Sequence, residues 1–311
     1  MIPIMSTPQI LVTGAAGGRQ GSTGNHVARM LLEHGIPIRA VVHCDDERSD
    51  NIRQLGAEIV AGDLLDFPFV RDAMKGIRRA YFAYPVQDGL LDATAVFATA
   101  ARQAEVELVA NLSQLIARDG TQPTPHQWRH WLSEQIFDWA DVGAVHLNPP
   151  VFFENLRAMA RGPLAQTGTV LLPWGPESTV FPMIAAEDVA RVAVGVLLGP
   201  IQPKNSVLPL VGQVLTIRDM MDAFSEALGR PIPYREITDE QWAQAVSAAG
   251  INSTAVEHLT HLWRHLRTSS AEVRATYKVS PAIEQLGGQP PKTLRQFLAE
   301  QAGQFAVGSS A

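Results

Sequence analysis

Along the first 150 residues, short runs of apolar and often β-branched residues alternate with longer segments whose apolar positions recur at helical spacing. The helical segments include residues 93–105 and 126–140. Strands that alternate with helices in this way predict an α/β fold built on a doubly wound parallel sheet. The predicted strands are residues 10–13, 38–42, 57–63, 80–85, 108–113 and 144–150.

After residue 150 this alternation ends and helical patterns dominate. Helices are predicted at 184–198, at 216–228 and from 238 onward, with one strand at 205–210. Thr216 followed by Asp219 is typical of a capped helix start.

These patterns divide the chain into two expected domains. The first covers residues 1–155 and has the organisation of a dinucleotide-binding sheet domain, which also receives segments near 180–212. The second covers residues 156–311 and is smaller and mostly helical. We expect it to cover the open edge of the sheet and to bind the substrate.

The first predicted strand leads into a loop with glycines at 14, 17, 18, 21 and 24, and a helical pattern follows. This order of strand, glycine loop and helix is typical of a dinucleotide-binding unit. A pyrophosphate must approach backbone N–H groups at a helix N-terminus, and side chains there would hold it away. We expect a bulky residue at Gly24 to abolish binding and leave the fold intact. A flexible connection without a ligand is the alternative.

Composition excludes several other classes of protein. The chain of 311 residues has a net charge of −6 and no basic stripe, so nucleic-acid binding has no electrostatic support. No apolar run approaches the ~20 residues that a membrane span needs, and the first residues lack the features of a signal peptide. The single cysteine, Cys44, fits a reducing compartment. We therefore expect a cytoplasmic protein with a small-molecule ligand.

The sequence resembles the NmrA-like family of atypical short-chain dehydrogenases. This resemblance implies a Rossmann domain and NAD(P) binding. It also implies either reduction of quinones or other small unsaturated compounds, or a non-catalytic redox-sensing role. The segments that carry the resemblance are Val12–Ala15, Gly24–Arg29, Leu31–Gly35, Gly56–Asp63, Pro150–Leu156, Ala186–Ala190 and Leu228–Tyr234.

The expected cofactor contacts lie in the glycine loop and at the ends of the predicted strands. In dinucleotide folds the end of the second strand meets the adenosine ribose. His43 and Arg19 offer positive charge to a 2′-phosphate there, whereas Asp45 and Asp46 favour a free hydroxyl. The balance slightly favours NADP(H) over NAD(H). The expected cofactor-binding residues are Gly14, Gly17, Arg19, Gln20, Gly21, Gly24, His43, Asp63, Tyr84 and Pro149.

The chain departs from the family and superfamily patterns at three places. Gly24, taken as the last glycine of the loop, lies four residues later than usual, and His43 stands where many members carry arginine. The superfamily uses a Tyr-x-x-x-Lys pair, but no tyrosine occurs between Ser113 and Tyr234. The corresponding helix instead carries His130-x-x-x-Glu134, which resembles the H-x-x-x-E motif of quinone-reducing relatives.

His126, His130 and Glu134 share one face of this helix because they are spaced four residues apart. We expect His130 to donate to a substrate oxygen, with Glu134 orienting the imidazole and raising its pKa. Ser113, at the end of the fifth strand, either binds a substrate carbonyl or caps the following turn. A solvent-facing helix with an ordinary charged pair is the alternative.

Aromatic residues near the strand ends suit a flat substrate, although packing between the domains is the alternative for each. The expected substrate-binding residues are Trp131, Phe152, Phe153, Asn155 and Trp174. Three further histidines recur at helical spacing, but the intervening leucines place them on the polar side of an amphipathic helix. They are His258, His261 and His265, and we expect no metal site there.

Two functions fit these observations. The first is an NAD(P)H-dependent reductase of a quinone-like or other flat unsaturated molecule, acting by direct hydride transfer. The second is a non-catalytic nucleotide sensor that changes partner binding with the state of the cofactor. We favour the enzyme. The sequence leaves open the substrate, a homodimer and, for a sensor, its protein partner.

Overall fold

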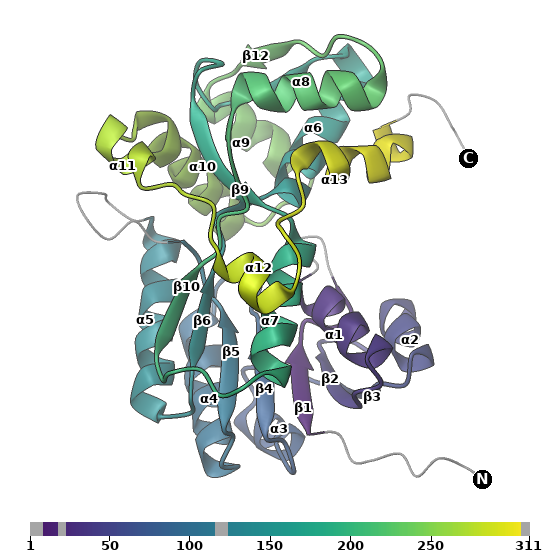
Figure 1. Cartoon of the computed structure of the whole chain (residues 1–311), viewed down its shortest axis with the longest axis vertical. Helices are drawn as coiled ribbons and strands as arrows, with labels where there is room; N and C mark the ends of the chain where they lie inside the picture. Colours follow the sequence, from purple (N-terminus) through teal and green to yellow (C-terminus); the bar gives the residue numbers. More distant parts are fainter. Residues whose placement is uncertain (1–8, 18–22, 116–123, 306–311) are drawn as a thin grey trace.

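The computed structural model describes residues 9–17, 23–115 and 124–305. Its larger part is a seven-stranded parallel sheet in the order β10-β6-β5-β4-β1-β2-β3 (Figure 1). The predicted doubly wound fold is confirmed. Because the strand order reverses beside β1, a ligand crevice is expected at the carboxyl ends of the central strands. The strands are β1 (Ile10–Thr13), β2 (Ile38–Val42), β3 (Glu58–Ala61), β4 (Arg79–Phe82), β5 (Leu108–Leu112), β6 (Val145–Asn148) and β10 (Ser206–Pro209).

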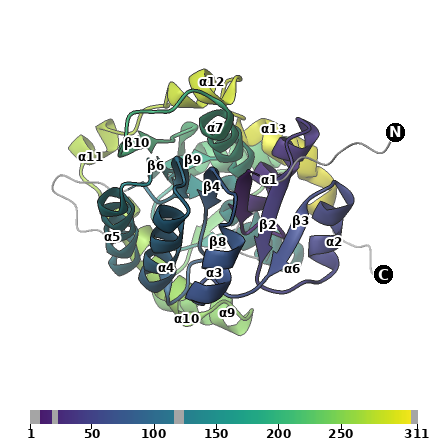
Figure 2. The same ribbon diagram turned by 90° about the horizontal axis from the view of Figure 1, so that it is seen from below.

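Helices cover both faces of this sheet and bury a separate apolar core on each side (Figure 2). One face is covered by α1 (Thr23–Glu33), α2 (Glu47–Gln54) and α7 (Ala186–Leu198). The other is covered by α3 (Phe67–Ala73), α4 (Leu90–Gln103) and α5 (Pro125–Ala140). The second core includes three phenylalanines in ring contact, Phe82, Phe97 and Phe137. α5 is thereby fixed against the sheet, with its inner face toward β5 and β6.

The smaller part has its own core, in which Trp174 stacks on Phe181 with ring centroids 4.4 Å apart. Its strands form two small sheets, β11-β9-β7 and β12-β8. These strands are β7 (Val151–Phe152), β8 (Val170–Leu172), β9 (Val180–Ile184), β11 (Gln213–Thr216) and β12 (Tyr234–Glu236). The helices are α6 (Phe153–Thr167), α8 (Ile217–Leu228), α9 (Asp239–Ala248), α10 (Ser253–Thr268), α11 (Ala271–Ala275) and α13 (Leu294–Gln301), followed by the 3-10 turn Ala302–Phe305.

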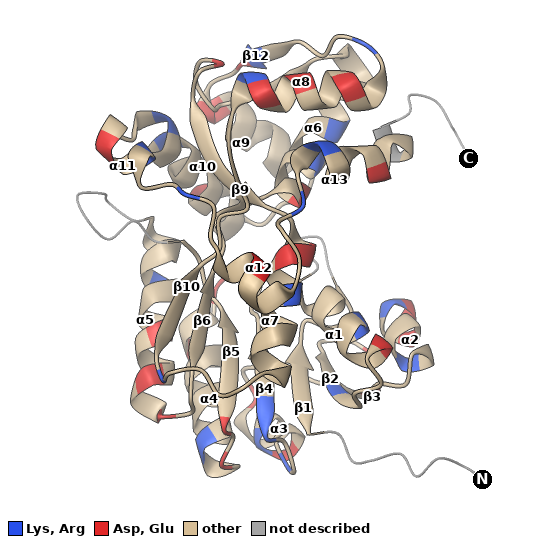
Figure 3. Ribbon diagram, in the orientation of Figure 1, with Lys and Arg blue, Asp and Glu red and all other residues tan. Residues whose placement is uncertain are grey.

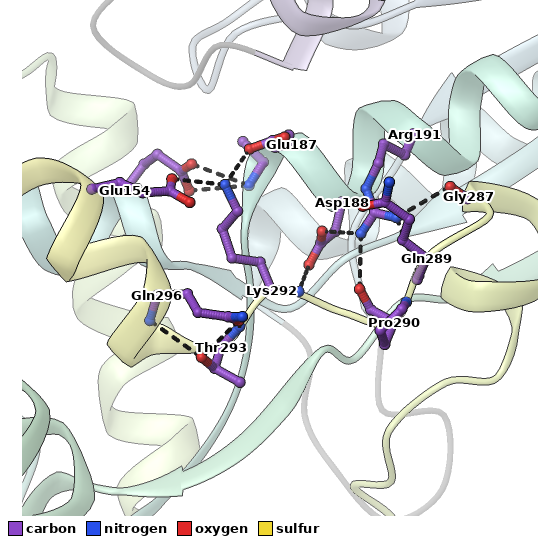
Figure 4. Close-up of polar contacts among 12 residues, drawn as sticks. Glu154, Glu187, Asp188, Arg191, Gly287, Gln289, Pro290, Lys292, Thr293 and Gln296 are labelled. Atoms are coloured by element: carbon purple, nitrogen blue, oxygen red, sulfur yellow. Dashed lines mark hydrogen bonds and ion pairs between the residues drawn. The ribbon is translucent and has the colours of Figure 1, made fainter.

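The C-terminal segment 282–301, which we call the strap, connects the two parts of the molecule. α12 (Ala282–Gly287) packs on α7, and the chain then returns to α13 (Figure 1). Arg191 of α7 donates to the carbonyls of Gly287, Gln289 and Pro290 (Figure 4). Lys292 pairs with Glu187 of α7 at 2.5 Å and with Glu300 of α13 at 2.8 Å. The strap therefore holds the smaller part in one orientation over the sheet.

Charges of both signs are interspersed over the ribbon, and no element in this view carries a continuous basic face (Figure 3). Within the described ranges, no helix has both the length and the apolar character that crossing a membrane requires.

Candidate functional site

The glycine loop has the backbone shape that its composition predicts. Gly14 and Gly17 adopt left-handed φ values of +66° and +73°, which glycine reaches without strain. The Gly17 N–H donates to the Gly14 carbonyl at 3.1 Å and closes a turn at the end of β1. A Cβ added at Gly14 would meet no atom within 4 Å. Open space therefore lies beside this turn, so these residues fit a pyrophosphate.

The close packing around Gly24 corrects one expectation about this residue. A Cβ there would lie 2.4 Å from the Thr13 carbonyl oxygen and 2.7 Å from that of Gly14. Gly24 thus allows α1 to pack closely on β1, and the expectation that a bulky residue would leave the fold intact is wrong. Three further expected contacts, Arg19, Gln20 and Gly21, lie outside the described residues.

The two aspartates after β2 are both engaged in local contacts. Asp45 pairs with Arg53 at 2.6 Å, and this side-chain hydrogen bond lowers the pKa of the aspartate. Asp46 caps α2 and pairs with Arg48 at 2.6 Å, and its pKa is lowered by that arginine. His43 is exposed at the end of β2.

A groove of about 480 Å³ lies beside the glycine loop. It is lined by Ala16, Gly17, Asn25, Arg29, Arg48, Asn51, Ile52 and Leu55.

Three other expected cofactor contacts lie just beyond the carboxyl ends of β3, β4 and β6. Asp63 accepts a hydrogen bond from the Leu65 N–H at 2.9 Å. The Tyr84 hydroxyl donates to the Asp88 carbonyl at 3.2 Å, which folds the ring over its own loop. The Pro149 carbonyl accepts from the Leu115 N–H at 2.9 Å. The fold therefore brings all three to the edge of the sheet that carries the glycine loop.

At this edge, Ser113 and Glu134 form a buried polar contact. The Ser113 hydroxyl donates to Glu134 Oε1 at 2.5 Å, and the Asn148 amide donates to the same oxygen at 3.0 Å. All three side chains are buried. Sequence reasoning missed Asn148, although its position at the end of an apolar strand was a usable signal. The hydroxyl hydrogen of Ser113 is therefore directed to a carboxylate.

The predicted histidine face of α5 points inward. His126 and His130 are 2% and 4% exposed, so the solvent-facing alternative is excluded. Their ring centroids lie 4.9 Å apart, and the His126 ring lies 4.9 Å from that of His258 on α10. His258 is also buried, which corrects its expected place on a polar helix face.

Burial determines the charge of these imidazoles. It lowers the pKa of His126 to about 4 and that of His258 to about 3. The pKa of His130 falls well below 6.5, first through burial and then through its histidine neighbours. The expected rise of the His130 pKa through Glu134 is therefore wrong, because loss of hydration outweighs any gain from the carboxylate. All three imidazoles are neutral at physiological pH.

A model of the NmrA-like family matches residues 6–294. The chain belongs to the NmrA-like family. It is 27% identical to NAD(P)H azoreductase of Xenophilus azovorans, over 96% of this chain and 99% of that relative. In structure it is similar to an NADPH-dependent quinone oxidoreductase of Escherichia coli solved with NADPH (TM-score 0.78, 20% identity, 94% of this chain and 99% of that one). It is also similar in structure to NmrA, a negative transcriptional regulator solved with NADP (TM-score 0.77, 16% identity, 94% of this chain and 95% of that one).

Distant homologues of this NmrA-like chain are thus NAD(P)H-dependent reductases, and NAD(P)H binding occurs in the family. The chain places none of its tyrosines on the helix where the superfamily carries its Tyr-x-x-x-Lys pair. All four lie within the described ranges, at Tyr81 in β4, Tyr84 after it, Tyr234 in β12 and Tyr277 beyond α11. α5 of this NmrA-like protein instead carries His126, His130 and Glu134 on its buried face.

The expected substrate residues separate into two groups. Trp131, Phe152 and Asn155 are half-buried, and Trp131 lies against Trp128 with ring centroids 5.6 Å apart. Phe153 and Trp174 are fully buried in the core of the smaller part. Their expected substrate role is corrected to packing, which was the alternative interpretation of the same pattern.

No group of histidine, cysteine or acidic residues in the described part of the chain is arranged to hold a metal ion.

Proposed function

We propose that this protein is an NAD(P)H-dependent reductase of a quinone-like or other flat, unsaturated small molecule. The observation that carries the proposal is the placement of two sets of groups at one edge of the sheet. The glycine turn ends β1, and the buried Ser113–Glu134–Asn148 contact lies at the ends of β5 and β6. The names of the azoreductase and quinone oxidoreductase relatives support the same class of reaction.

The residues that would hold the dinucleotide are the turn of Gly14 and Gly17 and the N-terminus of α1, with Asp63, Tyr84 and Pro149 along the same edge. The cofactor supplies hydride to the substrate when bound. We propose NADP(H) as the preferred form. Both aspartates near the ribose position are neutralised by arginines. Arg29 and Arg48 also line the groove next to Gly17.

Reduction adds a hydride and a proton to the substrate, and negative charge develops on the accepting oxygen or nitrogen. A neutral imidazole can offer an N–H hydrogen bond to that charge. His130 fits this role, because its lowered pKa keeps it uncharged. It does not supply the proton itself, since a neutral imidazole is a very weak acid. We assign the proton to water.

Ser113 offers its oxygen lone pairs rather than its proton. Its hydroxyl hydrogen is directed to Glu134, so Ser113 accepts a hydrogen bond from the substrate or from a water that delivers the proton. Glu134, held also by Asn148, orients the serine.

A nucleotide sensor is the second candidate. The groove beside the glycine loop favours nucleotide binding without requiring a reaction, and the structurally similar NmrA is a transcriptional regulator. Steady-state NADPH oxidation against a panel of quinones separates the two. The reductase predicts saturable oxidation with at least one quinone. NADPH binding in calorimetry with no oxidation by any member of the panel would favour the sensor.

A further inference from the structure

A chain of three imidazoles connects the smaller part to the candidate catalytic helix. His258 comes from α10, whereas His126 and His130 come from α5. The His126 ring contacts both of the others, at a tilt of 52° to His258 and nearly perpendicular to His130 at 84°. Each centroid separation is 4.9 Å. The three rings therefore form a continuous row that joins two different parts of the molecule.

His258 is the fixed end of this chain. Its Nδ1 shares a hydrogen bond of 2.9 Å with the hydroxyl of Thr124, the residue that caps α5. The start of α10 is anchored to the loop after β4, because Asn252 donates to the Val86 carbonyl at 3.1 Å and Thr254 donates to Asp88 at 3.3 Å. α10 thus reaches over the carboxyl edge of the sheet.

The other two rings lack such fixed partners. Both nitrogens of His126 and Nδ1 of His130 are buried and have no hydrogen-bond partner among the described residues. The contacts with its two neighbouring rings therefore restrain the orientation of His126, and the His126 ring in turn lies against that of His130. The other ionisable groups nearby are Glu134, one turn along α5, Arg129 and Asp88, which are exposed at the rim, and His261 on α10.

We propose that His258 is a positioning residue of the active site, which holds His126 and, through it, the N–H-bearing ring of His130. The role of His130 rests on the proposed reductase function, whereas the positioning itself does not. The smaller part then contributes more than a cover for the substrate, because it sets the direction of a hydrogen-bond donor on the sheet domain.

The test compares His258→Leu with His258→Gln and with the control His265→Leu. His265 lies on the same helix and is half-buried, but within the described part of the chain it makes no ring contact with these imidazoles. Ring resonances of His126 and His130 in isotope-labelled full-length protein report tautomer and titration directly. Steady-state kinetics with NADPH and a reducible quinone report the effect on turnover.

We expect His258→Leu to shift the ring signals of both histidines and to lower kcat about 10-fold. This loss is smaller than the ~10²-fold typical of a hydrogen-bond donor that is lost altogether. The KM for NADPH should be unchanged. His258→Gln, whose amide can still bond Thr124, should restore part of both effects, and His265→Leu should change neither. If His258→Leu does not fold, the comparison of His258→Gln with His265→Leu tests the proposal instead.

Unchanged His126 and His130 signals in the folded His258 variants would overturn the positioning role. Changed signals in a protein that oxidises no NADPH would keep the positioning and refute the reductase. Unchanged kcat in a variant with displaced rings would also overturn the proposal, because turnover would not depend on the orientation of His130.

Discussion

His130 and Glu134 lie one helical turn apart on α5, yet their surroundings give them different chemistry. Glu134 accepts hydrogen bonds from Ser113 and Asn148, whereas the His130 ring faces other imidazoles. Sequence spacing correctly predicted a shared face. It did not predict that desolvation would dominate the histidine, because burial depends on α10, whose contact with α5 is not visible in either segment alone.

This environment predicts how activity responds to mutation and pH. His130→Ala should lower turnover by roughly 10²-fold, the size typical of a lost hydrogen-bond donor to developing negative charge, with nucleotide affinity little changed, and His126→Ala should cost less. Because burial lowers the pKa of His130 well below 6.5, kcat should show no titration of this ring near pH 6.5. A kcat profile that titrates near pH 6.5 in the wild type and flattens in His130→Ala would contradict the assignment.

Gly24 provides a second prediction for a single residue. Gly24→Ala should lose about 3 kcal/mol or more of unfolding free energy, since overpacking against fixed backbone is costly and the added Cβ would overlap the Thr13 carbonyl. Gly14→Ala is the matched control, with a left-handed φ but open space, and should lose about 1 kcal/mol. Urea unfolding measures both. Equal losses would show that α1 can move away from β1.

Helices and strands whose ends are set by contacts within a few residues of sequence were predicted well. The capping box of Thr216 and Asp219 opens α8 as expected, because its hydrogen bonds lie within four residues. β8 and β9 were missed, since they lie in a stretch rich in glycine and proline. β8 forms through parallel pairing with β12, some 60 residues away, and β9 through pairing with β7 and β11.

The segment from β2 into α2 determines the expected cofactor preference. With Asp45 and Asp46 paired to arginines, NADPH should bind more tightly than NADH in calorimetry. Arg48→Gln should reduce this difference about 10-fold, the size expected for one hydrogen bond to a charged group. Arg71→Gln, on α3, is the control and should leave it unchanged. Tighter binding of NADH by the wild type would mean that the aspartates face the ribose.

The contact between α5 and α10 makes stability depend on pH. His126 and His258 have folded pKa values of about 4 and about 3, below the ~6.5 of the unfolded chain. The unfolded state therefore binds more protons as pH falls below 6.5, and the free energy of unfolding decreases. Each histidine contributes up to about 1.4 kcal/mol per pH unit, until pH passes its folded value.

Urea unfolding at pH 7, 6, 5 and 4 checks this dependence. His258→Gln should flatten the slope, whereas removing the exposed histidine in His34→Gln should leave it unchanged. Stability of the wild type that is constant or increases over this range would mean that the three rings are hydrated in the folded protein.

At the scale of the whole molecule, the alternation of strands and helices was sufficient to predict the doubly wound sheet and the edge that carries the glycine turn. The division of residues between site and core was not predictable in the same way. Phe153 and Trp174 follow strands as substrate residues would, but they turn into the core of the smaller part. His258 joins the site through a tertiary contact between α10 and α5, so periodicity gave it no distinguishing signal.

The central claim is that hydride passes from the bound nicotinamide to an unsaturated substrate at this edge of the sheet. The most direct measurement is the kinetic isotope effect on kcat/KM with NADPH deuterated at the transferred position of C4, using a quinone that the protein reduces. The account predicts a normal primary isotope effect with one NADPH consumed per molecule reduced. Tight NADPH binding without oxidation by any acceptor would contradict it, as would consumption of NADPH with no isotope effect in single-turnover experiments.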